Sequence, residues 1–216
     1  MSEIMIDIVS DVVCPWCFIG KRQLERALAK LRVERSDIVP RIRWLPYFLN
    51  PDTPVEGEPY RPFLERKFGG PEKLAQIQAQ VAKAGRAAGI DFAFERIEIR
   101  ANTLRAHRLI HHAQKTGDAG ELVERLFAAH FLDGEDIGNV PLLLRLAGEC
   151  GQDESAIRAY LASGEDEEEV RAQAERGQRM GITGVPFSIF NGRYGLGGAQ
   201  PPEVLLDAMR QSLMTH

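Results

Sequence analysis

The pattern that most limits how this chain can fold is a change of hydrophobic period across residues 4–31. Residues 4–9 alternate isoleucine with other side chains and are rich in β-branched residues, which predicts a strand. From Leu24 to Leu31 the apolar residues recur at helical spacing, with charged residues between them, which predicts an amphipathic helix. Two cysteines, Cys14 and Cys17, lie where the first pattern changes to the second.

A second strand is predicted over residues 41–49, where Pro46 favours an edge position or a bulge. A strand, a helix and a strand at this spacing are typical of a parallel βαβ unit with a right-handed crossover. The character then changes. Residues 50–70 contain four prolines and three glycines, which predicts a long loop with one helical turn near Phe63 and Leu64.

Helix signals dominate residues 71–179, beginning with Pro71, which suits a first helical turn. Residues 91–99 alternate only in places and are ambiguous between strand and loop. Further helix starts are predicted from capping patterns, and Gly164 is predicted to end one of these helices. The predicted starts are at Asn102, at Asp118 with Glu121, at Asn139 with Pro141, at Asp153 and at Asp166.

The last quarter of the chain returns to strand patterns. Residues 184–190 predict a strand entered through Pro186, Asn191-Gly192 predicts a two-residue hairpin turn, and residues 193–196 predict the returning strand. A final helix begins near Pro201. The strands at the two ends can share one sheet only if the helical block is an insertion. The predicted fold is therefore α/β, with residues 1–50 and 182–216 forming a discontinuous domain and residues 51–181 an inserted loop plus helical domain.

Charge and hydropathy exclude several classes of protein. The 216 residues include 27 Lys and Arg against 31 Asp and Glu. The sequence has no Lys- or Arg-rich run, which argues against nucleic acid or an anionic membrane as the main partner. Apolar runs are too short to span a bilayer, and residues 1–7 do not resemble a secretory signal. Three cysteines do not make a disulfide framework. We therefore expect a cytoplasmic protein, in a reducing compartment where a Cys pair is more often catalytic or metal-binding than structural.

The pair Cys14 and Cys17, separated by Pro15 and Trp16, predicts thiol–disulfide chemistry. A thiolate attacks a disulfide, and the N-terminal end of a helix stabilises a thiolate through its free N–H groups and its dipole. Pro15 fits the first helical position, where no N–H is needed. Cys14 is therefore the predicted nucleophile, and Cys17, one turn further along, is the predicted resolving thiol.

A metal site and a purely structural pair are the alternatives for these cysteines. Zinc would need two further ligands, but Cys150 stands alone and His107 and His111 lie about ninety residues away, beyond the usual finger spacing. No metal is predicted, and no cofactor beyond the Cys pair. Cys150 and His107 are expected to be core residues rather than reactive groups.

The motif Cys14-Pro15-Trp16-Cys17 after a strand, with Gly184-Val185-Pro186 before a late strand and hairpin, resembles the DsbA family of thioredoxin-fold oxidoreductases. Residues 10–17, 102–109 and 197–201 are similar to its cytosolic FrnE-like branch. The resemblance spans nearly the whole chain. It implies a thioredoxin-like fold with a large all-helical insertion and protein disulfide oxidoreductase or isomerase activity.

The same resemblance implies that Pro186 follows a cis peptide bond and faces the Cys pair, with the backbone of Val185 available to a substrate. Pro15 and Trp16 would also contact the substrate, which is a peptide or small-molecule thiol or disulfide. Strongly oxidising members carry a histidine between the cysteines, whereas Trp16 offers only an aromatic surface. Strong oxidising power therefore does not carry over, and a cellular reductant such as glutathione or another low-molecular-weight thiol would complete a reductase or isomerase cycle.

Asp7 and Asp11 are the candidate proton relays, by analogy with a buried acid in thioredoxin-like proteins, although a structural or solvated carboxylate is the commoner case. Two other functions remain open. One is a glutathione-dependent enzyme of the 2-hydroxychromene-2-carboxylate isomerase and kappa transferase class, which resembles this chain in fold but usually has Ser in place of Cys14 and lacks the second Cys. The other is a chaperone-like binding module without redox turnover.

Overall fold

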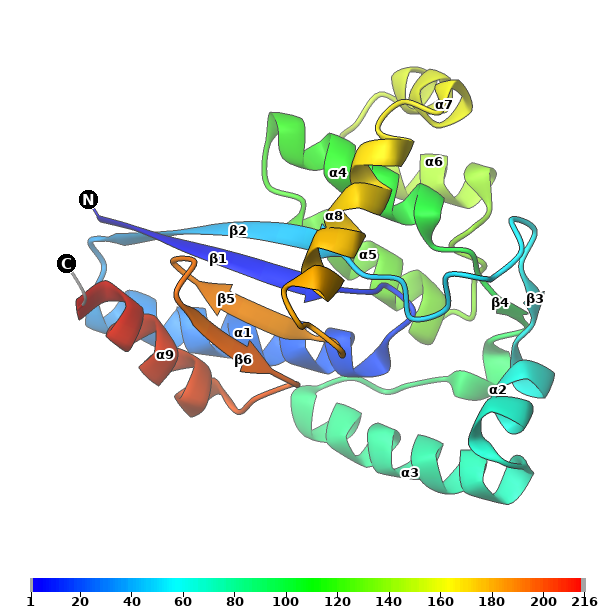
Figure 1. The fold of residues 1–216 in the computed structure, drawn as a ribbon, viewed down its shortest axis with the longest axis horizontal. Coiled ribbons are helices and arrows are strands. Elements are labelled where there is room, and N and C mark those ends of the chain that lie inside the picture. Colours follow the sequence, from blue (N-terminus) through cyan, green and yellow to red (C-terminus); the bar gives the residue numbers. More distant parts are fainter. Residues whose placement is uncertain (1, 215–216) are drawn as a thin grey trace.

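The computed structural model describes residues 2–214, and its centre is a four-stranded mixed sheet (Figure 1). The strands are β1 (Ser2–Ser10), β2 (Ile38–Pro46), β5 (Phe187–Phe190) and β6 (Tyr194–Gly197), in the order β2-β1-β5-β6. β1 and β2 are parallel, whereas β5 runs antiparallel to both β1 and β6. The strands from the two ends of the chain thus share one sheet, which confirms the predicted α/β fold with an insertion.

The alternation along β1 explains how helices cover the two faces of this sheet. Ile4, Ile6 and Ile8 are buried in the main core with residues of α1 (Pro15–Glu34) and α9 (Pro202–Met214). Val9 points to the other face, in a smaller cluster with Tyr47 and Ile182. There α8 (Glu167–Arg179) crosses the sheet and packs against β2 (Figure 1). Helix α8 therefore closes one face of the sheet, although its residues fall within the stretch predicted to form the inserted domain.

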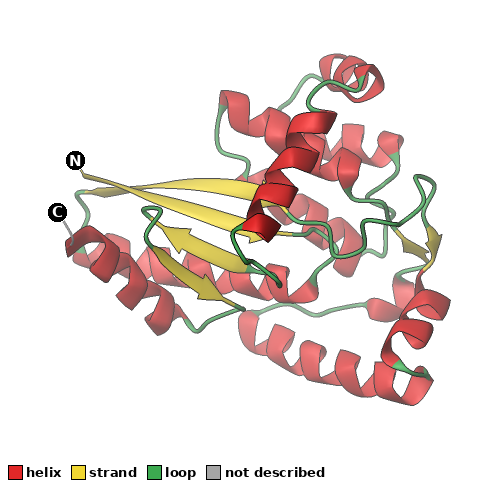
Figure 2. Ribbon diagram, in the orientation of Figure 1, coloured by secondary structure: helices red, strands yellow, loops and turns green. Residues whose placement is uncertain are grey.

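The insertion between β2 and β5 is mainly helical, as Figure 2 shows. Its other helices are α2 (Tyr60–Phe68), α3 (Pro71–Ala88), α4 (Leu104–Thr116), α5 (Gly120–Phe131), α6 (Val140–Glu149) and α7 (Glu154–Ser163). Two short strands, β3 (Glu58–Pro59) and β4 (Ile99–Arg100), pair with each other outside the main sheet. No helix within residues 2–214 is both long enough and apolar enough to cross a membrane.

Several predicted caps are present. The Asn139 side chain accepts a hydrogen bond from Leu142 N, and the Asp153 side chain accepts from Ser155 N and Ala156 N. Gly164 ends α7 in the left-handed conformation, with φ of 74°. Asp166 precedes α8 but makes no side-chain cap, because its carboxylate accepts a hydrogen bond from the Tyr160 hydroxyl and pairs with Lys115.

The other two predicted starts lie close to the observed ones. The Asn102 side chain accepts a hydrogen bond from Leu104 N at the start of α4. Helix α5 begins at Gly120 after Ala119, so Asp118 stands one residue too early for a capping box. Its carboxylate accepts a hydrogen bond from Gly120 N instead.

Three predicted boundaries differ from the structure. The strand expected over residues 41–49 runs over Ile38–Pro46, and the chain leaves the sheet at Tyr47. The loop expected over residues 50–70 contains the nine-residue helix α2, because Pro62 occupies its first turn, where a missing N–H costs nothing. The ambiguous stretch 91–99 forms a short 3₁₀ helix, Phe94–Arg96, and one residue of β4.

The predicted hairpin is present at Asn191-Gly192, but its loop has three residues rather than the predicted two, because Phe190 pairs with Tyr194. Asn191 and Gly192 both have positive φ, 50° and 65°, as a type I′ turn requires. The Asn191 side chain also accepts a hydrogen bond from Met5 N at 2.9 Å. The turn is therefore tied to β1 as well as joining β5 to β6.

An aromatic cluster joins α1 to the insertion. Phe18, directly after Cys17, stacks on Phe127 with ring centroids 5.0 Å apart and meets the edge of Phe92 at 6.1 Å. Phe18, Phe127 and Phe131 are fully buried. The helix that carries the cysteines is therefore held by the insertion as well as by the sheet.

Candidate active site

The two cysteines occupy the first turn of α1. Cys14 is the N-cap residue, and its backbone N–H donates to the carbonyl of Asp11 at 3.0 Å. Pro15 occupies the first helical position, and the first turn contains no acidic side chain. Cys17 N–H donates to the Cys14 carbonyl at 3.0 Å, and both thiols are free. A negative charge on Cys14 would face the positive end of the α1 dipole.

Cys14 and Val185 are 171 positions apart in the sequence but are in contact at the Cys14 sulfur. The Cys14 Sγ lies 3.7 Å from the carbonyl oxygen of Val185, and the Val185–Pro186 peptide bond is cis. Helix α1 approaches Pro186 closely: a Cβ added to Gly20 would come within 2.9 Å of the Pro186 Cγ. The structure thus brings Cys14, Cys17, Val185 and Pro186 together.

A cavity of about 430 Å³ opens beside Cys14. Cys14 and Cys17 are only 4% and 1% exposed, so Cys14 is reached through this cavity, whereas Trp16 at its rim is 42% exposed. The start of α1 and the loops that precede α1 and β5 supply Val13, Cys14, Pro15, Trp16, Gly184 and Val185 to its wall. The segment between β2 and α6 supplies Leu49, Asn50, Tyr60, Leu64, Lys67, Phe68, Leu74, Ile77, Gln78, Val81, Phe94, Arg100 and His130.

Burial determines the acidity of the Cys17 thiol. The pKa of the Cys17 thiol is raised well above its usual value, chiefly because the group is buried and then because of its hydrogen bond and charge interaction with Cys14. Hydrogen bonds from its surroundings, including the Asp11 backbone, offset part of this rise. Cys17 is therefore a protonated thiol near neutral pH, and its attack on a neighbouring disulfide needs removal of that proton.

The two candidate relay carboxylates are in different places. Asp11 is buried beneath the Cys loop, where its side chain accepts a hydrogen bond from Leu49 N at 2.9 Å and lies 3.2 Å from His107 Nε2. Asp7 instead forms a two-pronged ion pair with Arg43 of β2, at 2.6 and 2.7 Å. Of the two, Asp11 lies beside the cysteines, and its carbonyl also accepts from Cys14 N.

Three basic residues in the cavity wall were not anticipated from the sequence: Lys67 at the end of α2, Arg100 in β4 and His130 in α5. Each comes from a different element of the insertion, and no local motif marks them. His130 lies between Ala129 and Phe131 on a buried helix face, so its neighbours suggest only a core position.

His130 is a neutral buried side chain. Its Nδ1 lies 3.5 Å from the Glu135 carbonyl, which can only accept, so Nδ1 is the donor and Nε2 the acceptor. Within residues 2–214, Nε2 has no hydrogen-bond partner. Burial lowers the pKa of His130 to about 4.

The depressed pKa of His130 predicts a loss of stability in mild acid. The unfolded chain takes up this proton near pH 6.5 but the folded one only near pH 4, so the contribution is complete above pH 6.5 and disappears as the pH falls to 4. The shift corresponds to about 3 kcal/mol. Urea unfolding at a series of pH values should show a shallower decline over this range for His130→Gln than for the unchanged protein. Parallel curves would contradict this assignment.

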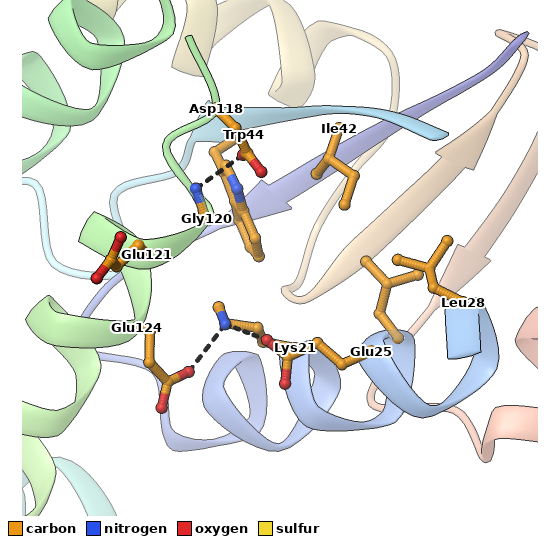
Figure 3. A pocket seen from close by; sticks show the side chains of 10 residues that line it. Lys21, Glu25, Leu28, Ile42, Trp44, Asp118, Gly120, Glu121 and Glu124 are labelled. Atoms are coloured by element: carbon orange, nitrogen blue, oxygen red, sulfur yellow. Dashed lines mark hydrogen bonds and ion pairs between the residues drawn. The ribbon is translucent and has the colours of Figure 1, made fainter. Parts of the chain in front are cut away.

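A second cavity, of about 380 Å³, lies between α1, β2 and the start of α5 (Figure 3). Lys21 is buried there between Glu25 and Glu124, with its Nζ 2.8 Å from Glu124 Oε2. Arg22 also pairs with Glu124. These ion pairs join α1 to α5, and neither cysteine lines the cavity. Among residues 2–214, no group of three or more His, Cys, Asp or Glu side chains could hold a metal ion.

A mixed sheet with α1 and α9 on one face, a Cys-X-X-Cys pair at the start of α1 and a cis Val185–Pro186 bond whose Val185 carbonyl lies beside Cys14 define a thioredoxin-fold protein with a redox-type motif. The sequence profile of the DSBA-like thioredoxin domain matches residues 5–210. The chain therefore belongs to the DSBA-like thioredoxin domain family.

Individual relatives agree with this assignment. A probable DsbA oxidoreductase from Streptomyces coelicolor has a structure similar to this one, with a TM-score of 0.88, 28% identity and coverage of 99% of this chain and 91% of that one. The uncharacterised protein YwbO of Bacillus subtilis is 27% identical over 186 residues, 85% of each chain. The cytosolic disulfide reductase DsbM of Pseudomonas aeruginosa, in its structure with GSH, has a TM-score of 0.67 at 21% identity, covering 97% of this chain and 98% of that one, and shares the fold.

Proposed function

We propose that this protein is a thiol–disulfide oxidoreductase in which Cys14 attacks the substrate disulfide and Cys17 resolves the product. The observation that carries the proposal is the position of Cys14. Its sulfur lies at the start of α1, beside the Val185 carbonyl, and in the wall of a cavity large enough for a small ligand.

The reaction of the reduced pair has two exchanges. The Cys14 thiolate attacks one sulfur of a substrate disulfide, which forms a Cys14–substrate disulfide and releases the other half as a thiolate. After losing its proton, Cys17 attacks the Cys14 sulfur and releases the second half. The substrate disulfide is thereby reduced to two thiols, and the two cysteines are oxidised to one disulfide.

The different surroundings of the two thiols support this order of attack. Cys14 lines the cavity, whereas Cys17 is buried behind it and has a raised pKa. A protonated Cys17 does not compete for the incoming substrate, and it reacts once the mixed disulfide has made the Cys14 sulfur, one helical turn away, open to attack. The Asp11 side chain, buried beneath the same loop, is the proposed route for the Cys17 proton.

The cycle needs a reductant to return the Cys14–Cys17 disulfide to two thiols. We infer a cytoplasmic setting in which glutathione or another low-molecular-weight thiol does this, so that the net reaction is reduction or isomerisation of disulfides. The glutathione-dependent isomerase alternative is disfavoured because both cysteines are present and Cys17 has a defined place in the exchange.

A turnover assay tests the proposal. With a reducing thiol in excess, the purified protein should accelerate reduction of insulin or of a small disulfide in proportion to its concentration. The Cys150→Ser variant is the matched control, because Cys150 lies at the end of α6 and outside the cavity wall, so its rate should equal that of the unchanged protein. A rate no greater than that of the reducing thiol alone would overturn the proposal and would favour a non-catalytic binding module.

A further inference from the structure

The cavity beside Cys14 is mainly apolar. Its aliphatic and aromatic wall residues include Leu49, Leu64, Phe68, Ile77, Val81 and Phe94. Such a wall favours a ligand with an apolar body, since apolar surface gains about 25 cal/mol per Å² when it leaves water. A volume of about 430 Å³ suits a small molecule or one side chain, not a folded domain.

The cavity mouth carries a positive charge that lacks a carboxylate partner. Lys67 is exposed, and its Nζ donates to the neutral Asn50 side chain at 2.8 Å. Within residues 2–214, no carboxylate forms an ion pair with Lys67. Partial burial and then the nearby Arg100 lower the pKa of Lys67, and the charge of Asp11 offsets part of this fall, so a bound anion would relieve the remaining repulsion between the two cations.

Arg100 adds a second cation that is only partly neutralised. Its guanidinium pairs with Glu58 and lies over the Phe63 ring at 3.6 Å, but its buried Nε has no hydrogen-bond partner within residues 2–214. Glu58 is shared with Arg66, 3.5 Å away. One carboxylate thus serves two arginines.

The cleft that adjoins the cavity mouth also has more basic than acidic side chains. It shares Leu49, Asn50, Lys67 and Arg100 with the cavity and adds Asp52, Glu58 and Arg66. Three cations therefore face two carboxylates at this mouth.

We propose that this cavity selects low-molecular-weight disulfides that have an apolar body and a carboxylate, with Lys67 and Arg100 holding the carboxylate and the disulfide facing Cys14. This inference rests on the proposed function, because it names the substrate of that site. Glutathione fits less well, because its two carboxylates and its ammonium would all need partners inside a mainly apolar wall.

A single-turnover experiment compares two aryl disulfides, the anionic dithiobis(nitrobenzoate) and the neutral dithiodipyridine. Each rate constant with the reduced protein is divided by that of the same disulfide with a free thiol, which removes the difference in intrinsic reactivity. We expect the normalised preference for the anionic disulfide to fall about fivefold in Lys67→Gln. Lys83→Gln removes the same charge from the exposed side of α3 and should keep the preference.

A binding measurement separates this inference from the proposed function. In Cys14→Ser, which cannot exchange disulfides, methylthiobenzoate should bind more tightly than methylthiobenzamide, and adding Lys67→Gln should reduce the difference, because only Arg100 then remains to hold the carboxylate. Such binding without any turnover by the unchanged protein would leave the cavity assignment standing and overturn the oxidoreductase. Turnover with equal normalised rates for the two aryl disulfides, or with a preference for oxidised glutathione or a peptide disulfide, would overturn the selectivity alone.

Discussion

Cys14→Ser reduces disulfide exchange to the uncatalysed background, whereas Cys17→Ser stops the reaction at a covalent complex with the substrate. Serine is close in size to cysteine, but its hydroxyl is not ionised near neutral pH, so the first variant has no nucleophile. In the second variant Cys14 still attacks, but nothing within one helical turn can release the bound half. The two variants are therefore expected to fail in different ways.

Intact mass measurement distinguishes them. After mixing with a disulfide in the absence of added thiol, Cys17→Ser should gain the mass of one substrate half, and a reducing agent should remove it. Cys14→Ser should gain nothing at this site. If Cys17 in the Cys14→Ser variant gained mass about as fast as Cys14 does in Cys17→Ser, the assignment of Cys14 as the nucleophile would be wrong. Each variant is best made on the Cys150→Ser background, which removes the third thiol.

Phe18→Ala is expected to lower the free energy of unfolding by about 3–5 kcal/mol. Phe18 is fully buried and stacks on Phe127. The substitution therefore removes apolar surface that is buried on folding, and it leaves a cavity between α1 and α5. Urea denaturation followed by circular dichroism measures the loss. Phe18→Leu keeps most of the side-chain volume and should lose clearly less.

The control for specificity is Phe63, which is half-buried and packs under Lys67 and Arg100 on the outer side of the insertion. Phe63→Ala should destabilise the protein less than Phe18→Ala. Equal losses for Phe18→Ala and Phe18→Leu, or a loss below about 1 kcal/mol for Phe18→Ala, would contradict the account of α1 as a helix anchored by the insertion.

The elements that sequence reasoning predicted correctly are those specified by nearby residues. The alternating isoleucines of β1, the apolar stripe of α1 and the Asn191-Gly192 turn each depend on interactions within a few positions. The insertion followed from topology, since two strand-forming ends and a helical middle allow few other arrangements. Helix α2 was missed because Pro59 and Pro62 were interpreted as loop residues, although a proline in the first turn is compatible with a helix.

The cysteines of the site could be predicted from the sequence, but the residues to which we assign its selectivity could not. Cys14 and Cys17 sit in a contiguous motif, whereas Lys67 and Arg100 converge from two elements that are distant in the sequence. Their positions depend on how α2 and β4 pack, and spacing along the chain carries no record of this. Asp7 illustrates the same limit: its pairing with Arg43 follows from the register of β1 against β2.

The wall of the Cys14 cavity comes from two parts of the chain. One part holds the reacting atoms in place, and the other can be substituted without moving them. Cys14 at the start of α1 and Val185 in the loop before β5 form one side of the cavity, and Pro186 packs so closely on Gly20 that a Cβ added there would lie 2.9 Å from the Pro186 Cγ. Most of the remaining wall belongs to α2, α3 and the segment leading to β4. Substitutions in that part change the shape of the cavity that receives the substrate and leave the reacting atoms where they are. We therefore expect relatives with the same cysteines to differ in substrate preference while they share one reaction. Grafting residues 58–100 from one relative into another should transfer that substrate preference.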